Sequence, residues 1–421
     1  MPKEFKKLHI LILVARFPNI VQPYIVDHLV GLKQAGFRFS IIAAKKGDLL
    51  KYQPEIDQCE LLKDVVYFNI DSFFDFIHES FLLFYPNYEY KKFIKLTLHE
   101  LTSFLYKKYS LKYVLKALLK TRLISNDKHI HLIHSHYLTG SYEYLFLKEI
   151  FGIPLITTFH GLQPQGVKEL AYEKMQRVFK EGDLFLVNTK FAEQQLASLG
   201  CPLNKIKILP QGIDLSRFPF HSREFPPKGK LILLSVCRLS PEKGLIYALE
   251  AIANIAKQRK VEYRIVGHGP QHNELEKLAI RLNIRDKVKF LGIVDTKTLQ
   301  LQYAESHIFL LPSIDFQNGT HVETQGVVIQ EAQAFGLPVI ATKTGGIPES
   351  VGNTAILVEQ KSEVAIYNAI KLLLKNPEYY RKLTEEGRHW VEKRYDKQKI
   401  IKQLLELYED IIKNNKKLKS F

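Results

Sequence analysis

The stretch Lys230-Leu-Ile-Leu-Leu-Ser-Val-Cys-Arg-Leu-Ser-Pro-Glu-Lys-Gly244 begins with an apolar run and ends in a loop that carries two cations. The continuous apolar character of Lys230–Val236 is typical of a strand that is buried on both faces of a parallel sheet. Pro241 comes next in the loop, and proline favours the first turn of a helix. The stretch therefore predicts a strand–loop–helix unit, from which doubly wound α/β sheets are built.

The same alternation of strands and helices continues on both sides of this unit. Before it, strands are expected at Leu8–Ala15, Phe37–Ala43, His131–His136, Pro154–Thr158 and Leu184–Asn188, and helices at Ile25–Ala35, Tyr142–Ile150 and Ala171–Glu181. After it, strands are expected at Tyr263–Val266, Val288–Leu291, Ile308–Leu311 and Pro338–Ala341. Strands separated by helices pair in parallel, so the predicted fold class is α/β, with two Rossmann-like doubly wound domains.

A short polar segment separates the two series of strands. Ser222–Lys228 contains Pro226, Pro227 and several charges, which is typical of a linker. We expect a first domain over residues 1–215, a linker over 216–229, a second domain over 230–395, and a C-terminal helix with a Lys-rich tail over 396–421 that packs back on the first domain. The crevice between two such domains is the natural ligand site.

Composition limits the class of protein further. The chain has 421 residues, a mass of 48.8 kDa and 46% hydrophobic residues, which is the composition of a globular protein. The three cysteines, Cys59, Cys201 and Cys237, are scattered, which favours a reducing compartment and argues against a disulfide framework or structural zinc. No apolar run reaches the roughly 18 residues of a membrane span, so we expect a cytoplasmic protein.

Two cations stand in the loop of the opening stretch. Arg238 and Lys243 come directly after a strand, at the edge of the sheet where phosphates bind in folds of this class. Arginine offers a planar fork and lysine a point charge, a combination that suits a diphosphate. The alternative is an ordinary pair of surface cations.

Two carboxylates stand in the segment Glu323-Thr-Gln-Gly-Val-Val-Ile-Gln-Glu331. A helix is expected to begin near Gly326, so its first N–H groups would point into the crevice and favour a negative charge there. Glu323 in the preceding loop is then suited to sugar hydroxyls, and Glu331 on the helix to ribose hydroxyls. The alternative is two glutamates on a helix surface, which are common at this spacing.

Two further loops follow strands. His160 and Gly161 come just after Pro154–Thr158, where the glycine permits close approach of a ligand, although a lone histidine is more often structural. Gly269 lies in Val266-Gly-His-Gly-Pro270, which suits a phosphate-contacting loop. Neither this loop nor Arg16–Pro23 has the glycine pattern of a dinucleotide fingerprint, so NAD or FAD is not expected.

Together these motifs are more specific than any one of them. Their order and spacing, from the first strand to about Tyr395, resemble the retaining glycosyltransferases of family 4, which have the GT-B fold. The resemblance is strongest over Pro210–Phe218, Val236–Gly244 and Glu331–Glu349. The opening Phe17-Pro…Gln22-Pro-Tyr-Ile25 resembles the members that build bacterial surface polysaccharides such as lipopolysaccharide or exopolysaccharide.

The resemblance implies a donor site between an acceptor domain (1–215) and a nucleotide-sugar donor domain (230–395). In it Arg238 and Lys243 would hold the donor diphosphate, Glu331 the ribose and Glu323 the transferred sugar, with His160 bonding the sugar from the first domain. The remaining implied donor contacts are the backbone amides of Gly326, Val327 and Val328, the Gly269 loop, and Gly292 beside the base. Family members often have glycine where this chain has Thr324, and a glycine-bearing first loop, so these departures leave the sugar and acceptor open.

The implied reaction moves a hexose from a UDP- or GDP-sugar to a glycan or lipid-linked acceptor with retention of configuration. We expect no cofactor and no metal, since no Asp-x-Asp pair lies in a loop suited to bind one. Two alternatives stay open: a nucleotide-sugar epimerase on the same fold, and a basic polyanion-binding protein without catalysis.

The net charge of +16 has a local source. Residues 91–122 hold nine Lys or Arg and one Glu, interleaved with aromatic and leucine side chains. A basic amphipathic helix of this kind can lie on an anionic bilayer, which predicts peripheral binding at the inner face of the cytoplasmic membrane, and no nucleic-acid partner. The alternative is an aromatic core helix with solvated lysines. The candidate membrane-facing residues are Lys91, Lys92, Lys95, Lys107, Lys108 and Lys112.

Overall fold

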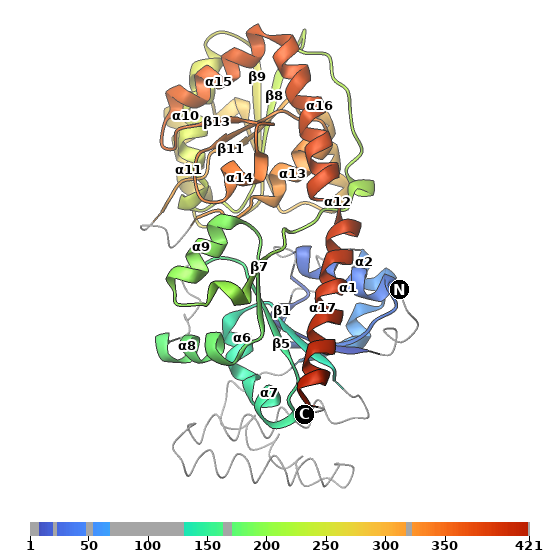
Figure 1. Cartoon of the computed structure of the whole chain (residues 1–421). Helices are drawn as coiled ribbons and strands as arrows, with labels where there is room; N and C mark the ends of the chain where they lie inside the picture. Colours follow the sequence, from blue (N-terminus) through green and yellow to red (C-terminus); the bar gives the residue numbers. More distant parts are fainter. Residues whose placement is uncertain are drawn as a thin grey trace.

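A computed structural model describes residues 8–19, 23–47, 54–67, 130–162, 171–316 and 322–419. These residues form two lobes, each built around a parallel sheet, which are stacked end to end (Figure 1). The basic segment 91–122, and with it the predicted membrane-facing lysines, lies outside the described residues. Among the residues that are described, no helix has the length and apolar character needed to cross a bilayer.

The N-terminal lobe contains one sheet, which in the described part of the chain has seven parallel strands in the order β3-β2-β1-β4-β5-β6-β7. The strands are β1 (His9–Phe17), β2 (Arg38–Lys46), β3 (Val65–Tyr67), β4 (Leu132–Ser135), β5 (Leu155–Phe159), β6 (Leu184–Val187) and β7 (Ile206–Ile208). The helices are α1 (Pro23–Gln34), α2 (Glu55–Gln58), α6 (Leu138–Glu143), α7 (Leu145–Phe151), α8 (Tyr172–Glu181) and α9 (Lys190–Ser198).

The C-terminal lobe repeats this plan, with six described parallel strands in the order β10-β9-β8-β11-β12-β13. The strands are β8 (Leu231–Val236), β9 (Val261–Val266), β10 (Val288–Gly292), β11 (Ile308–Leu311), β12 (Val339–Thr342) and β13 (Ile356–Val358). The helices are α10 (Leu245–Ala256), α11 (His272–Arg281), α12 (Thr296–Glu305), α13 (Val327–Ala334), α14 (Ile347–Val351), α15 (Glu363–Lys375) and α16 (Pro377–Arg394).

The predicted α/β class with two doubly wound sheets is confirmed, and each predicted strand is found within three residues of its expected limits. The expected single helix over Tyr142–Ile150 is wrong, because α6 and α7 are separate helices. The chain leaves helical geometry at Tyr144, whose φ and ψ are −115° and 11°. Tyr144 is buried beneath the sheet, so packing determines its backbone more than helix propensity does.

Both sheets reverse their strand order next to a central strand, β1 in the first and β8 in the second. The chain therefore leaves a crevice outside the carboxyl ends of β1 and β4, and another outside β8 and β11. The loops that follow β5 and β6 contact the loop that follows β11, so the two sheets present these edges to each other. The candidate motifs all lie at this junction.

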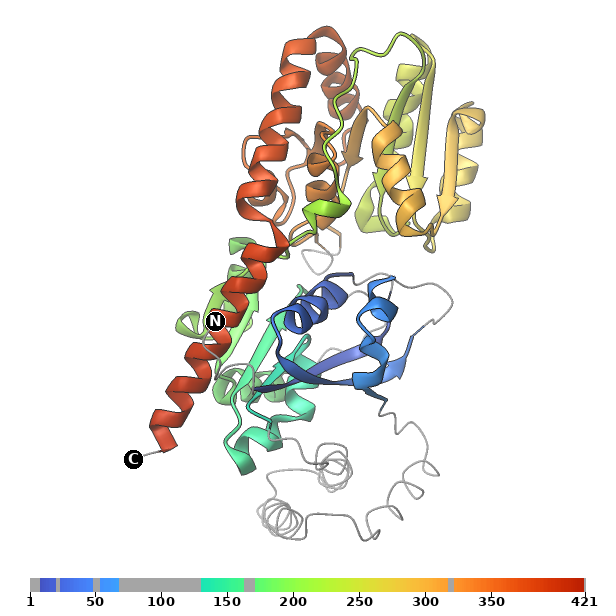
Figure 2. The same ribbon diagram turned by 90° about the vertical axis from the view of Figure 1, so that its right-hand side faces the viewer.

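Helix α17 (Lys397–Lys419) joins the lobes. It begins at the junction and runs along the N-terminal lobe to the far end of that lobe (Figures 1 and 2). Its apolar face, including Leu404, Leu405, Tyr408 and Ile412, is part of the same buried cluster as β1, β2 and α1. The last helix of the described chain thus completes the core of the first lobe.

The segment between the sheets follows the surface of the C-terminal lobe. The Arg223 guanidinium donates to the backbone carbonyls of His221, Phe335, Gly336 and Tyr303. Phe225 stacks on Tyr380 with 3.7 Å between ring centroids. The predicted linker residues are therefore held in place by one lobe.

Candidate active site

The clearest feature at the junction is an ion pair between two of the predicted residues. Lys243 closes the short turn after β8, and Glu323 lies in the long loop after β11; the Lys243 ammonium nitrogen is 2.5 Å from Glu323 Oε2. Each side chain is 19% exposed. Burial lowers the pKa of Lys243, but the carboxylate of Glu323 outweighs it, so the net pKa is raised and the ammonium stays charged. The structure thus unites two motifs that are 80 residues apart.

Gly244 explains how the Lys243 turn reaches this position. Its φ is +59°, in the left-handed region. A Cβ placed there would lie 2.0 Å from the carbonyl oxygen of Pro312, which follows β11. Only glycine allows both the backbone conformation and this close approach.

Arg238 lies on the same loop and is exposed. Its guanidinium has no hydrogen bond or ion pair within the described part of the chain, so it is available to a ligand. The loop is held by the segment after β9: a Cβ on Gly267 would lie 1.9 Å from the oxygen of Cys237, and one on Gly269 would lie 2.3 Å from the oxygen of Leu239. Gly269 therefore permits close packing of two loops, and its contact with a donor stays a prediction.

Gly292 ends β10 and has a φ of +67°. Its carbonyl accepts a 2.8 Å hydrogen bond from the amide of Gly267, which connects the end of β10 to the loop after β9. Open space surrounds its Cα, because an added Cβ would meet no atom within 4 Å. This space is compatible with the base contact that the sequence predicts there.

The predicted helix start near Gly326 is found. Gly326 is the N-cap of α13 with a φ of +74°, and its amide donates to Glu323 Oε1 over 3.2 Å. The amides of Val327 and Val328 belong to the first turn, where N–H groups have no acceptor within the helix. The partial positive charge of this helix end therefore lies beside the Lys243–Glu323 pair.

The loop before α13 is also fixed from behind. The amide of Gly346 donates to the carbonyl of Glu323 over 2.9 Å. A Cβ on Gly346 would lie 1.8 Å from the oxygen of Thr324, and one on Gly345 would lie 2.1 Å from the oxygen of Glu323. The Gly345–Gly346 pair thus lets the loop after β12 support the backbone that carries the carboxylate.

Thr324, one of the two departures from the family pattern, lies at the contact between the lobes. Asn188 Nδ2 donates to its hydroxyl over 2.9 Å, and the hydroxyl of Thr189 donates to its carbonyl over 2.8 Å. The Cα of Gly161 is so near that an added Cβ would lie 2.7 Å from the Thr324 methyl carbon. The threonine therefore gives the N-terminal lobe a direct hold on the Glu323 loop.

Glu331 lies on α13, and its Oε2 accepts a 2.7 Å hydrogen bond from the hydroxyl of Tyr303. Burial raises the pKa of Glu331 to about 7, although the hydrogen bond from Tyr303 and the charge of Arg217 act in the opposite direction. Its carboxyl therefore changes protonation close to neutral pH.

His160 lies directly after β5, as predicted, but both of its ring nitrogens are occupied. Nε2 lies 3.2 Å from His136 Nδ1, and Nδ1 lies 3.0 Å from the amide nitrogen of Gln211. The ring stacks on His136 with 5.4 Å between centroids and also packs against Tyr24. Burial, assisted by His136, lowers its pKa well below the usual value, so the ring is neutral. A sugar hydroxyl would have to replace one of these two partners.

A pair of glutamines that the sequence motifs did not indicate joins the lobes. The backbone amide of Gln211 donates to Gln325 Oε1 over 2.8 Å, and Gln325 Nε2 donates back to the carbonyl of Gln211 over 2.9 Å. Both residues lie inside motifs that the sequence already singled out, Pro210–Phe218 and Glu323–Glu331. Their pairing was not visible in the sequence, because it joins residues 114 positions apart.

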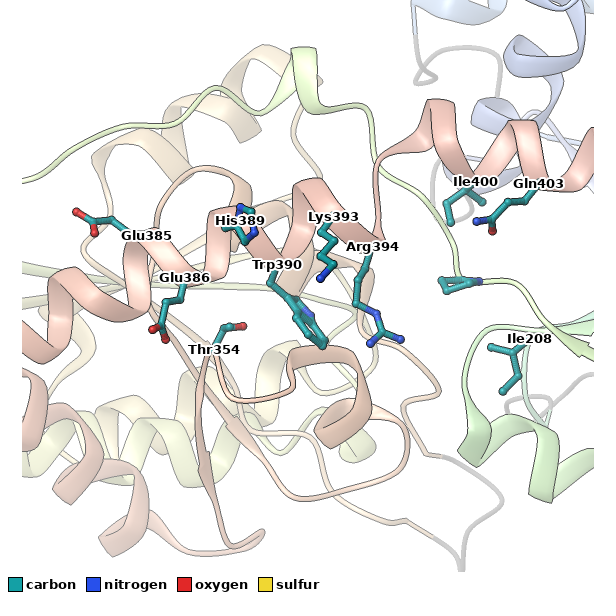
Figure 3. A pocket seen from close by; sticks show the side chains of 11 residues that line it. Ile208, Thr354, Glu385, Glu386, His389, Trp390, Lys393, Arg394, Ile400 and Gln403 are labelled. Carbon is teal, nitrogen blue, oxygen red and sulfur yellow. The ribbon is translucent and has the colours of Figure 1, made fainter.

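Two cavities lie near the junction. One of about 80 Å³ lies beneath His160 and is lined by Tyr24, Asp27 and further histidines. The other, of about 850 Å³, is a groove between α16, the start of α17 and β7, lined by Trp390 and Arg394 (Figure 3). None of the predicted site residues lines this larger groove, so its size does not make it the reaction site. Within the described ranges, no group of three or more His, Cys, Asp or Glu is arranged to hold a metal ion.

The two Rossmann-like parallel sheets face each other with their carboxyl edges, which is the architecture of the GT-B class. Family comparisons agree with this architecture. A family model described as "Glycosyltransferase Family 4" matches residues 21–217, and one described as "Glycosyl transferases group 1" matches residues 217–390. The chain belongs to the family 4 glycosyltransferases.

Relatives support the same family. A putative colanic acid biosynthesis glycosyltransferase, WcaL, of Salmonella typhimurium is 33% identical over half of this chain and 53% of its own length. The amylovoran biosynthesis glycosyltransferase AmsK of Erwinia amylovora is 27% identical over 80% of this chain and 83% of its own length. The match to WcaL thus spans about half the length of that relative.

Solved structures share the fold. Anabaena HepE, crystallised with UDP and glucose, has a TM-score of 0.72 and 18% identity, with 96% of this chain and 100% of that chain covered. WaaG, a glycosyltransferase involved in lipopolysaccharide biosynthesis, has a TM-score of 0.62 and 14% identity, with 95% of this chain and 99% of that chain covered. The GT-B fold expected from the motifs is therefore confirmed.

Proposed function

We propose that this chain transfers a hexose from a nucleotide-sugar to a glycan or lipid-linked acceptor in polysaccharide biosynthesis, with retention of configuration and without a metal or cofactor. The observation that carries the proposal is the Lys243–Glu323 pair beside the start of α13. It supplies a cation for a diphosphate, a carboxylate for sugar hydroxyls, and a helix N-terminus for negative charge, all within one crevice.

The chemistry follows from the charges. The bond between the anomeric carbon and the phosphate oxygen breaks, its electron pair stays on the diphosphate, and positive charge develops on the sugar. Arg238, Lys243 and the amides of Gly326–Val328 then stabilise the departing diphosphate, which is how fixed dipoles and cations lower such a barrier. The acceptor hydroxyl attacks the same face of the sugar, and its proton passes to the departing phosphate oxygen.

The ion pair also explains how the two side chains are positioned before a donor binds. Glu323 holds the Lys243 ammonium in place before any donor arrives. When the diphosphate binds, the ammonium is shared between two anions, and Glu323 becomes free to accept bonds from sugar hydroxyls. In the proposed complex the Lys243 ammonium therefore both positions Glu323 and binds the donor diphosphate.

The names of relatives leave the nucleotide open. HepE was crystallised with UDP and glucose, whereas two mycobacterial relatives are named as GDP-mannose-dependent mannosyltransferases, each matched over 60% of its length. We therefore retain both UDP- and GDP-sugars as donors. Peripheral binding to an anionic membrane remains a prediction from residues 91–122, which lie outside the described residues.

A thermal-shift screen tests the proposal. A donor that binds only the folded state stabilises it by about 2.7 kcal/mol at one hundred times its Kd, so we expect a rise in Tm with one of the UDP- or GDP-sugars. Product analysis with a glycan acceptor then identifies transfer. Conversion of the donor to its epimer without an acceptor would identify an epimerase instead. Salt-sensitive binding of random DNA, with no donor response, would identify a polyanion-binding protein.

The raised pKa of Glu331 gives a second test at the same site. Ribose hydroxyls are bound best by the ionised carboxylate, which predominates above its pKa of about 7. We expect the affinity for the intact nucleotide-sugar to be full above pH 7 and to fall by up to about tenfold per pH unit below it. Calorimetric titration from pH 5.5 to 8.5 measures this slope. Glu331→Gln should bind weakly and independently of pH; an equal slope in that variant would assign the titration to another group.

A further inference from the structure

A continuous chain of hydrogen bonds connects the junction to the C-terminal helix. Gln211 Nε2 lies 3.0 Å from His160 Nδ1, and His160 Nε2 lies 3.2 Å from His136 Nδ1. His136 Nε2 lies 3.0 Å from His28 Nδ1, and His28 Nε2 lies 2.9 Å from the hydroxyl of Tyr408. Each ring thus uses one nitrogen on each side.

The chain continues beyond Tyr408. Its hydroxyl is also hydrogen-bonded to His134 Nδ1, and His134 Nε2 lies 2.6 Å from the hydroxyl of Thr158. Four different elements contribute: α1 carries His28, β4 carries His134, β5 carries Thr158 and α17 carries Tyr408. This series of hydrogen bonds therefore cannot form until α17 packs against the N-terminal sheet.

All of these rings are neutral. Burial lowers the pKa of each histidine, that of His136 to about 3. The charged groups that line the same small cavity are Asp27 and Lys397, and they are paired with each other at 3.2 Å. A neutral imidazole has one N–H donor and one acceptor nitrogen. Each contact between two ring nitrogens is thus a hydrogen bond, with a proton on one of the two nitrogens. Among the described residues these rings do not form a metal site.

When neutral rings are hydrogen-bonded in series, every hydrogen bond must be donated in the same direction along the series. If one ring accepts at Nδ1, it donates at Nε2, and the next ring must then accept at Nδ1. The amide nitrogen of Gln211 can only donate, so it makes His160 Nδ1 an acceptor. The remaining links follow in turn, from His160 through His136 and His28 to Tyr408.

We propose that this series of hydrogen bonds fixes His160 as the tautomer with its proton on Nε2, and that Gln211 and Tyr408 are positioning residues for His160. The consequence for substrate choice rests on the proposed function. A sugar group that replaces Gln211 at Nδ1 must donate a hydrogen bond, so the site takes a hydroxyl there. A carboxylate at the same place, as in a uronic acid, has no proton to give.

The donor loop enters this arrangement through Gln211. The backbone of Gln211 is held by Gln325, two residues from Glu323 and next to Gly326. A rearrangement of the Glu323 loop on donor binding can therefore be transmitted to His160 through Gln325 and Gln211. This places the first link of the chain at the junction itself.

Nitrogen NMR of the ¹⁵N-histidine-labelled full chain tests the proposal, because it distinguishes protonated from unprotonated ring nitrogens. His160, His136 and His28, assigned with single His→Asn variants, should each carry the proton on Nε2. Gln211→Glu replaces the amide by a carboxylate that only accepts, so the proton of His160 should move to Nδ1, and the two following rings should reverse as well. Gln258→Glu is the matched control: the exposed Gln258 donates a hydrogen bond to the partly buried Tyr367 in the other lobe, so this substitution should leave the pattern unchanged.

The kinetic readout separates this proposal from the proposed function. Gln211→Glu and Tyr408→Phe should each lower kcat by about tenfold to a hundredfold, the usual cost of losing an orienting partner, with donor KM little changed. Protons on Nδ1 in the unmodified chain, or an unreversed pattern in Gln211→Glu, would overturn the tautomer assignment whatever the activity. If the tautomers are as proposed but no donor supports transfer, the proposed function is overturned and the tautomer assignment stands.

Discussion

Replacement of Arg238 by alanine is expected to lower the turnover of nucleotide-sugar by about three orders of magnitude while the fold is unchanged. A cation aimed at a departing phosphate contributes on this scale to the barrier of such reactions. The guanidinium is exposed and has no partner among the described residues, so its loss removes charge stabilisation without breaking a structural contact. Steady-state kinetics and the unfolding midpoint, measured on the same preparation, check both halves of the expectation.

Lys243→Ala should show a loss of the same order, accompanied by weaker donor binding, because the ammonium also holds Glu323. Arg281→Ala is the matched control, since Arg281 is an exposed arginine on α11 away from the junction. Near-normal transfer by both Arg238→Ala and Lys243→Ala would show that the diphosphate does not bind here.

Gly244→Ala is expected to destabilise the C-terminal lobe by roughly 3–5 kcal/mol. The left-handed backbone costs a residue with a Cβ about 1–2 kcal/mol, and the overlap with the Pro312 oxygen, 2.0 Å away, adds a steric cost of similar or larger size. Denaturant unfolding followed by circular dichroism measures the change.

Gly229→Ala is the control for this substitution, because a Cβ there meets no atom within 4 Å. Its effect should stay within about 0.5 kcal/mol. Equal stability of the two variants would mean that the Lys243 turn can shift away from β11, and would weaken the argument that glycine is needed to place the ammonium.

The long strands of both sheets could be predicted because each is a continuous apolar run buried on both faces. The short edge strands β3, β7 and β13 could not, since three residues carry no periodicity. The break at Tyr144 was also invisible, because a buried aromatic residue fits a helix pattern equally well. Local sequence therefore predicted the layers, and tertiary packing determined the edges and breaks.

The candidate site divides in the same way. Arg238, Lys243, Glu323 and Gly326 could be predicted as candidates because each lies within a few residues of a strand end or helix start. The partners of His160 were not found. His28 lies 108 positions from His136 and 380 from Tyr408, and no local pattern indicates that such residues share a hydrogen bond.

Helix α17 has a consequence for the order in which the protein is made. Because the ribosome releases residues 397–419 only after the whole second lobe, the first lobe emerges with the surface for Leu404, Leu405 and Tyr408 uncovered. The N-terminal half must wait, partly folded, while the C-terminal half is synthesised and folds as a unit. His28 and His134 gain their shared partner only at the end, so the junction reaches its final form last of all.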